Sequence, residues 1–155
     1  MAIFKELVWL VTSYLITFVV STLLIVYVLQ VPLFITGQQK LIKEYYYDNI
    51  LSSTILDIFL IFFYLLLAQA VIYVLNVNRI ITRLFLVAFV TLCISGAFYL
   101  LFKSKPLDKK SFFSRWFYAA GFYAVIYDMV LITTSYAILM FTLMKTKKRV
   151  SEWLK

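Results

Sequence analysis

Histidine is absent from the sequence, cysteine occurs once and glycine three times. With Cys93 alone, the chain forms neither an internal disulfide nor a Cys/His metal site. Cys93 lies within an apolar run and is expected to be a small packing residue. Nucleophilic catalysis usually needs a base beside a Ser or Cys, and no Gly-x-Ser-x-Gly elbow, phosphate loop or dinucleotide fingerprint is present. We therefore expect a protein that is not an enzyme and holds no metal and no cofactor.

Charged residues are also scarce. They make up 14% of the chain, whereas soluble domains typically carry about 25%. Hydrophobic residues reach 65%, which leaves too little polar surface to cover a soluble globule. These residues form continuous apolar runs, without the alternation that barrel strands show. Because backbone groups in lipid must be hydrogen-bonded within the segment, the runs predict helices.

The sequence predicts an all-α, polytopic membrane protein, a bundle of four transmembrane helices in one membrane domain. A helical span takes about 20 apolar residues. The first run is too long for the apolar part of a signal peptide, so it is expected to be a span. The very short link between the second and third spans predicts an antiparallel hairpin. We place the spans at about 7–34, 50–75, 84–102 and 117–143, followed by a basic tail at 144–155.

Basic residues exceed acidic ones, 15 against 7, and they flank the apolar runs. This position favours the lipid bilayer and its anionic headgroups as partner, and not nucleic acid. An even number of spans places both termini on one side, and the compact basic tail leads us to expect that side to be cytoplasmic. The residues expected to contact headgroups or an acidic partner protein are Lys103, Lys105, Lys109, Lys110, Arg115, Lys145, Lys147, Lys148 and Arg149.

Two acids fall inside the predicted spans. Asp57 lies about 10 Å into the second span, and Asp128 lies about 6 Å deeper in the fourth, near the middle of the bilayer. A charged side chain at the centre of a span costs at least about 2.5–3.5 kcal/mol, and no base lies deep in any span to neutralise it. Each acid is therefore expected to be protonated, hydrogen-bonded or facing a wet cavity.

Each predicted span also carries one face of small or hydroxyl-bearing residues at helical spacing. Small residues let neighbouring helix backbones approach closely. If these faces turn inward, Asp57 and Asp128 meet hydroxyl groups in the centre of the bundle. The polar members are Ser13, Thr17 and Ser21 in the first span, Thr54 and Tyr64 in the second, Thr91 and Ser95 in the third, and Ser135 in the fourth.

Two functions compete for this arrangement. The first is a non-enzymatic structural or assembly protein of a membrane, a homo-oligomer or a subunit of a larger assembly, in which the acids fix helix packing. The second is a small oligomeric proton or cation channel or transporter that uses Asp57 and Asp128. The chain lacks a potassium filter, a periodic arginine sensor and Gly/Pro-broken helices, so we prefer the first. A wet cavity shared by the acids would favour conduction, and sealing against Tyr or Thr would favour packing.

Residues 103–136 carry a resemblance to a known group of proteins. Its motifs are Lys103-Ser104-Lys105-Pro106-Leu107, Phe112-Phe113-Ser114-Arg115-Trp116-Phe117, Gly121 and Ala124-Val125-Ile126-Tyr127-Asp128, with Tyr45–Tyr47 and Leu56-Asp57 as weaker matches. The stretch resembles small uncharacterised four-span membrane proteins encoded by large DNA viruses of algae and protists. The resemblance implies a component of the virion's inner membrane or of a membrane of the infected cell, and it supplies no catalytic motif.

Overall fold

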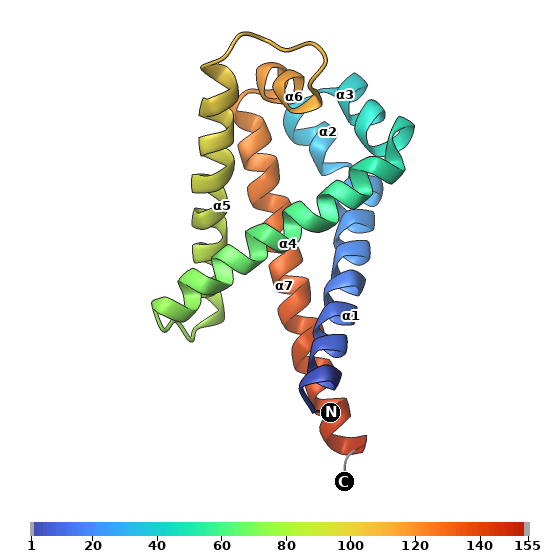
Figure 1. Ribbon diagram of the computed structural model, residues 1–155, viewed down its shortest axis with the longest axis vertical. Coiled ribbons are helices and arrows are strands. Elements are labelled where there is room, and N and C mark those ends of the chain that lie inside the picture. The colour runs from blue at the N-terminus through green and yellow to red at the C-terminus, as the bar shows by residue number, and fades with distance from the viewer. Residues whose placement is uncertain (1, 154–155) are drawn as a thin grey trace.

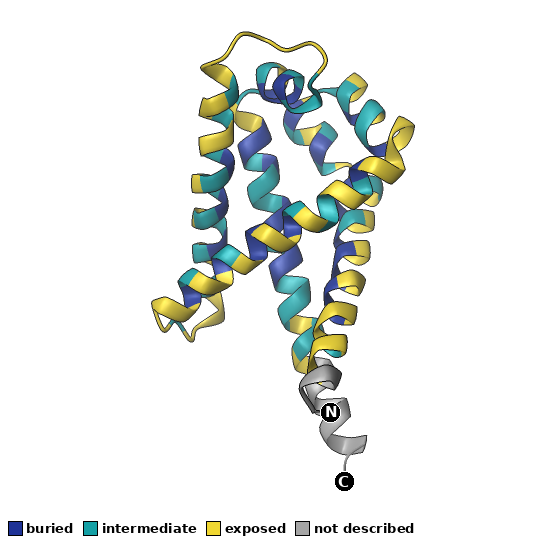
Figure 2. Cartoon of the chain, viewed as in Figure 1, coloured by how far each residue is buried: buried dark blue, intermediate teal, exposed yellow. Residues whose placement is uncertain are grey.

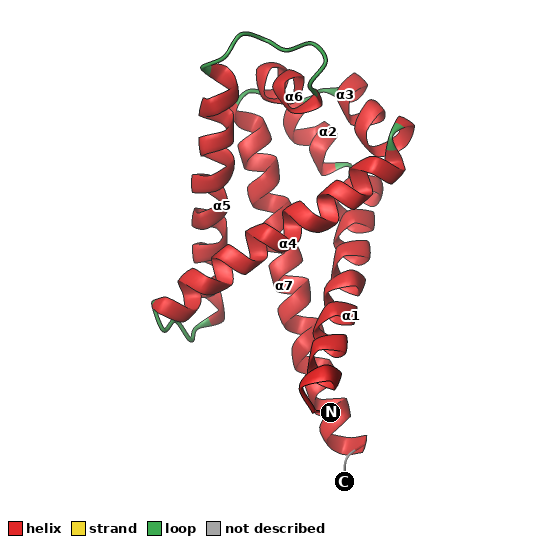
Figure 3. Ribbon diagram, in the orientation of Figure 1, coloured by secondary structure: helices red, strands yellow, loops and turns green. Residues whose placement is uncertain are grey.

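A computed structural model describes the backbone of residues 2–153 and the side chains of residues 6–144. The described chain is helical, with no strand (Figure 3). Four of its helical segments are long and apolar enough to cross a membrane, which confirms the predicted all-α, multi-pass membrane protein. These crossing segments are Glu6–Val28, Ile50–Val74, Ile80–Lys103 and Phe122–Met144.

The crossing helices form a bundle, and shorter helices gather at one of its ends (Figure 1). Helices α1, α5 and α7 follow the long axis, and α4 crosses the bundle diagonally. The first turns of α1 and the last turns of α7 lie at the opposite end from the short helices. In chain order the elements are α1 (Ala2–Thr22), the π-helix η1 (Leu23–Val28), α2 (Val31–Thr36), α3 (Gln39–Lys43), the π-helix η2 (Glu44–Asp48), α4 (Ile50–Val74), α5 (Ile80–Lys103), α6 (Phe112–Ala120) and α7 (Phe122–Trp153).

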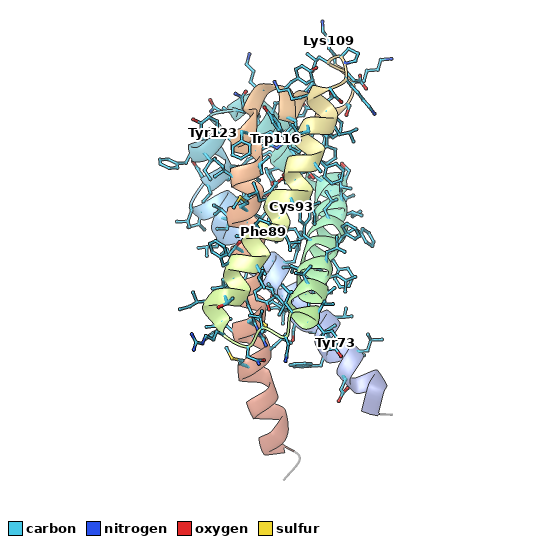
Figure 4. All side chains as sticks on the ribbon, turned by 90° about the vertical axis from the view of Figure 1, so that its left-hand side faces the viewer. Tyr73, Phe89, Cys93, Lys109, Trp116 and Tyr123 are labelled. Atoms are coloured by element: carbon cyan, nitrogen blue, oxygen red, sulfur yellow. The ribbon has the colours of Figure 1, made fainter. Side chains whose placement is uncertain are left out.

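Helix α7 is the centre of the packing, since α1, α2, α4, α5 and α6 all contact it. The faces of the crossing helices that carry small and hydroxyl residues turn inward (Figure 2), as the sequence predicted, and the outer sides expose many large apolar side chains. Figure 4 views the outer face of α5, which carries Phe89 and Cys93. The prediction that Cys93 is a small packing residue is wrong for the described chain, because its side chain is exposed on that face.

The first crossing helix ends earlier than predicted. Helical structure was expected to continue to residue 34, but it stops at Val28. In an unbroken helix the ring of Pro32 would clash with the carbonyl of Val28, four residues before it. The chain instead turns at Gln30, whose φ is 48°, and Pro32 lies in the first turn of α2. Proline is well suited to that position because the N–H it lacks has no helical partner there.

Helices α4 and α5 form the predicted antiparallel hairpin, and the two helices diverge toward the end that carries α6 (Figure 1). The chain turns at Asn76, whose φ is 50°. Helix α5 begins at Ile80, before the predicted start at residue 84. The extra turn takes in Arg83, whose Nε donates a hydrogen bond to the carbonyl of Val77 at 2.9 Å. Because a loop carbonyl accepts this hydrogen bond, the charged Arg83 can lie inside the first turn of α5.

The fourth crossing helix begins later than predicted, at Phe122 instead of residue 117. Gly121 separates α6 from α7 with φ 60° and ψ −140°, a backbone conformation close to the region that only glycine adopts readily. Ser111 begins α6 by accepting the N–H of Ser114 at 3.3 Å. Helix α6 is seen nearly end-on in Figure 1, so it lies across the end of the bundle. Asp128 is consequently only about 9 Å into α7, close to the depth of Asp57 in α4.

We predict that Gly121→Ala destabilises the protein by about 1–3 kcal/mol, because alanine pays a steric cost in this conformation. Gly96→Ala is the matched control, since an added methyl group meets nothing within 4 Å at either glycine. Gly96 lies within a helix, where alanine is favoured by roughly 0.5–1 kcal/mol. Unfolding by SDS in mixed micelles, followed by circular dichroism, measures both changes. Equal stability of the two variants would show that the break at residue 121 does not need glycine.

Candidate functional site

A cavity of about 200 Å³ lies between α4, α5 and α7, beneath α6 and η2. Asp57 of α4 and Asp128 of α7, the two acids that the sequence singled out, both line it. Most of the remaining lining is aliphatic or aromatic, and no Lys or Arg contributes to it. The structure therefore brings the two predicted acids to one largely apolar chamber near one end of the bundle.

Asp57 is held by a tyrosine from the connector before its own helix. Tyr45 of η2 donates its hydroxyl to Asp57 Oδ1 at 2.6 Å. Burial, followed by the nearby Asp57 carboxyl group, raises the pKa of Tyr45 above its usual value of 10. The phenol therefore keeps its proton at neutral pH and remains a hydrogen-bond donor to the acid.

Asp128 is held by a serine from the neighbouring crossing helix. The buried Ser95 of α5 donates its hydroxyl to Asp128 Oδ2. Tyr64 of α4 lies beside Ser95, so all three helices around the cavity supply polar groups to this point. Two of the inward faces predicted from helical spacing, those of α5 and α7, thus meet at a hydrogen bond.

A pair of tyrosines forms a further hydrogen bond next to the cavity. The hydroxyls of Tyr46 and Tyr127 lie 2.7 Å apart, and Tyr27 donates to the carbonyl of Tyr46 at 2.9 Å. The sequence did not single out these partners or Tyr45, because three consecutive tyrosines beside an apolar run are also typical of the membrane interface. The signal available for Tyr127 was its position directly before Asp128 in the chain.

The end of the bundle is closed by contacts between α6 and η2. Both terminal nitrogens of Arg115 bond the Glu44 carboxylate, at 2.5 and 2.6 Å. The Arg115 guanidinium lowers the pKa of Glu44, so the pair is ionised at neutral pH. Phe112 stacks on Tyr45 with ring centroids 4.5 Å apart. Arg115, which we expected to contact headgroups, is thus engaged within the protein.

The other predicted hydroxyls do not reach the acids. Thr91 donates to the carbonyl of Val87 in its own helix at 2.8 Å, and Ser21 does the same to Phe18 at 3.2 Å. The hydroxyls of two further buried residues have no partner in the described part of the chain, so the predicted hydroxyls do not form a continuous polar series through the bundle. The remaining predicted positions are Thr17 and Ser135, which carry those two hydroxyls, the buried Ser13 and the half-buried Thr54.

The predicted basic residues are distributed along the surface. The ammonium of Lys103 lies 4.6 Å from the ring centroid of Tyr118. Lys109 extends from the loop beyond α5 at the outer end of the molecule (Figure 4), and Lys105 and Lys110 of this loop are exposed as well. The side chains of Lys145, Lys147, Lys148 and Arg149 lie outside the described residues.

No group of three or more acids or cysteines within the described residues could hold a metal ion. Comparison of the chain with protein-family models, with curated proteins and with solved structures finds no match. The similarity of residues 103–136 to membrane proteins of large DNA viruses therefore stays a prediction.

We predict that Tyr45→Phe destabilises the protein by about 1 kcal/mol, because Asp57 loses its hydroxyl donor. Tyr123→Phe is the matched control, since this ring is 60% exposed and points away from the bundle (Figure 4). Exposed substitutions of this kind usually change stability by less than about 0.5 kcal/mol. Unfolding in mixed micelles compares the two variants, and equal stability would mean that the bond to Asp57 does not support the fold.

Proposed function

We propose that the protein is a non-enzymatic integral membrane protein with a structural or assembly role, in which Asp57 and Asp128 fix the packing of the bundle. The observation that carries this proposal is that each acid accepts a hydroxyl from a different element. Tyr45 of η2 serves Asp57, and Ser95 of α5 serves Asp128. Such bonds between helices order a membrane bundle in which apolar side chains have little preference for one another over lipid.

The outer surface is consistent with a protein that works within a membrane. Large apolar side chains such as Phe59 on α4 and Phe85 on α5 are exposed on the outside of the bundle. Burial is lowest in the segment Ile80–Lys103, where 17% of the most apolar window is buried within the chain. Lipid or further subunits would cover this surface.

A proton or cation conductor is the second candidate, and one observation favours it: both acids line the same cavity. Two features place it second. The walls of the cavity are mostly apolar, and the hydroxyls of Thr91 and Ser21 are bonded to carbonyls of their own helices. A conduction path needs a continuous series of polar groups or water across the membrane.

The packing role predicts different outcomes for two substitutions at one position. Asp128→Asn keeps an acceptor of the same size for the Ser95 hydroxyl, so folding and oligomer distribution in detergent should not change. Asp128→Leu removes the acceptor and should lower stability by about 1 kcal/mol and alter the oligomer distribution. Size-exclusion chromatography and SDS unfolding measure both effects. An unchanged oligomer distribution and unchanged stability in Asp128→Leu would count against the packing role.

Liposomes that contain the purified protein distinguish the two candidates. We predict that proton and potassium flux stay at the level of empty liposomes under a pH gradient and an imposed voltage. Flux well above that level, lost in Asp57→Asn or Asp128→Asn, would instead establish the conductor and make these acids its working residues.

A further inference from the structure

The cavity opens sideways toward the lipid. Helices α4 and α5 diverge toward the end that carries α6 (Figure 1). The cavity lies in this divergence, because its lining includes Leu56 of α4 and Phe98 of α5. These two side chains are 38% and 40% exposed, so the wall that they form reaches the outer surface of the bundle. A molecule dissolved in the membrane could therefore enter without passing through the end of the bundle.

The volume fits a molecule with one ring. An apolar cavity of about 150 Å³ is enough to hold benzene, and this cavity has about 200 Å³. Aromatic rings form much of its wall, among them Tyr45, Phe102, Phe113 and Trp116. The faces of aromatic rings attract cations, and groups of such rings recognise quaternary ammonium ligands.

Once ionised, the acids would give the cavity a negative charge, and no basic residue of its lining neutralises that charge. Each carboxyl group uses one oxygen for its hydroxyl partner, Oδ1 in Asp57 and Oδ2 in Asp128. The other oxygen of each has no hydrogen-bond partner among the described residues. The nearest basic group on the closing helix, Arg115, is paired with Glu44. A buried negative charge is stabilised when a positive charge lies beside it.

We propose that this cavity is a binding site for a small hydrophobic ammonium compound, which enters from the lipid between α4 and α5 and places its cationic group beside Asp57 and Asp128. This site goes beyond the packing role, because it uses the carboxylate oxygens that packing leaves free. A phospholipid headgroup fits poorly, since its phosphate would lie against two acids with no base in the lining. A bare inorganic cation also fits poorly, because hard cations need several oxygen ligands and the lining offers few.

The test uses isotope-labelled benzyltrimethylammonium, which has one ring and a permanent charge. Binding is measured by equilibrium dialysis against the full-length protein in phosphatidylglycerol nanodiscs, with empty nanodiscs subtracted. We expect saturable binding to one site per chain. We expect binding at least ten-fold weaker for neopentylbenzene, which has the same shape but carries carbon in place of the charged nitrogen. Absence of saturable binding, or equal affinity for the neutral compound, would overturn the proposal.

Variants distinguish binding of the cation in the cavity from its non-specific attraction to the membrane. Asp57→Asn and Asp128→Asn should each weaken binding of benzyltrimethylammonium at least ten-fold, whereas Asp108→Asn, an acid of the exposed loop, should leave it unchanged. Leu60→Trp adds bulk to the cavity lining while both acids stay in place, and it should also abolish binding, which provides a test if an Asn variant fails to fold. Undiminished binding in folded Asn variants, or in Leu60→Trp, would contradict the site.

Changing the lipid composition tests whether a lipid headgroup, and not a small ligand, occupies the cavity. Binding should remain saturable at one site per chain in nanodiscs of phosphatidylglycerol and of phosphatidylcholine, with a weaker apparent affinity in phosphatidylcholine because its surface does not attract cations. Loss of binding in phosphatidylcholine would show that the choline headgroup of a lipid occupies the cavity, which contradicts the proposed small ligand. The packing role is tested independently by the stability of Asp128→Leu, so each proposal can fail while the other stands.

Discussion

The carboxyl groups of Asp57 and Asp128 lie inside membrane-crossing helices, where a polar group without a hydrogen-bond partner costs several kcal/mol. Neither partner comes from the helix that carries the acid. Tyr45 belongs to the connector before α4, and Ser95 belongs to α5, which runs antiparallel to α7. The hydrogen bonds to the two acids therefore fix the position of η2 relative to α4 and the position of α5 relative to α7. The small residues on the inward faces then set how closely the backbones approach.

The contacts at the end of the bundle hold Tyr45 in the position from which it bonds Asp57. Tyr45 can serve Asp57 only if η2 is held in place, and α6 does this through the bidentate pair of Arg115 and Glu44 and the stacking of Phe112 on Tyr45. A partly exposed ion pair contributes little to stability, but its two parallel bonds define the orientation of the helices that it joins. Gly121 is equally necessary, because a continuous helix through this residue would carry α6 away from η2.

The sequence was sufficient for the features that depend on composition and period. Continuous apolar runs predicted four crossing helices, and helical spacing predicted that Ser95 and Asp128 lie on inward faces. The missing features depend on contacts between residues far apart in the chain, such as Arg115 with Glu44 and Tyr127 with Tyr46. The depth of Asp128 was misjudged because one glycine inside an apolar run does not reveal its φ. Gly96 lies in a similar apolar run and remains helical, so the same residue type has opposite effects at two positions.

The presence of aspartate, and not asparagine, at positions 57 and 128 relates the packing role of these residues to ligand binding. A hydroxyl donor needs only an acceptor, and the amide oxygen of an asparagine would accept the same bond from Tyr45 or Ser95 without the risk of a buried charge. Aspartate adds a second carboxylate oxygen and the ability to carry negative charge. At both positions that extra oxygen has no hydrogen-bond partner in the described part of the chain, and both carboxyl groups line one chamber with aromatic walls. Packing accounts for one oxygen of each acid, and a cationic ligand accounts for the other.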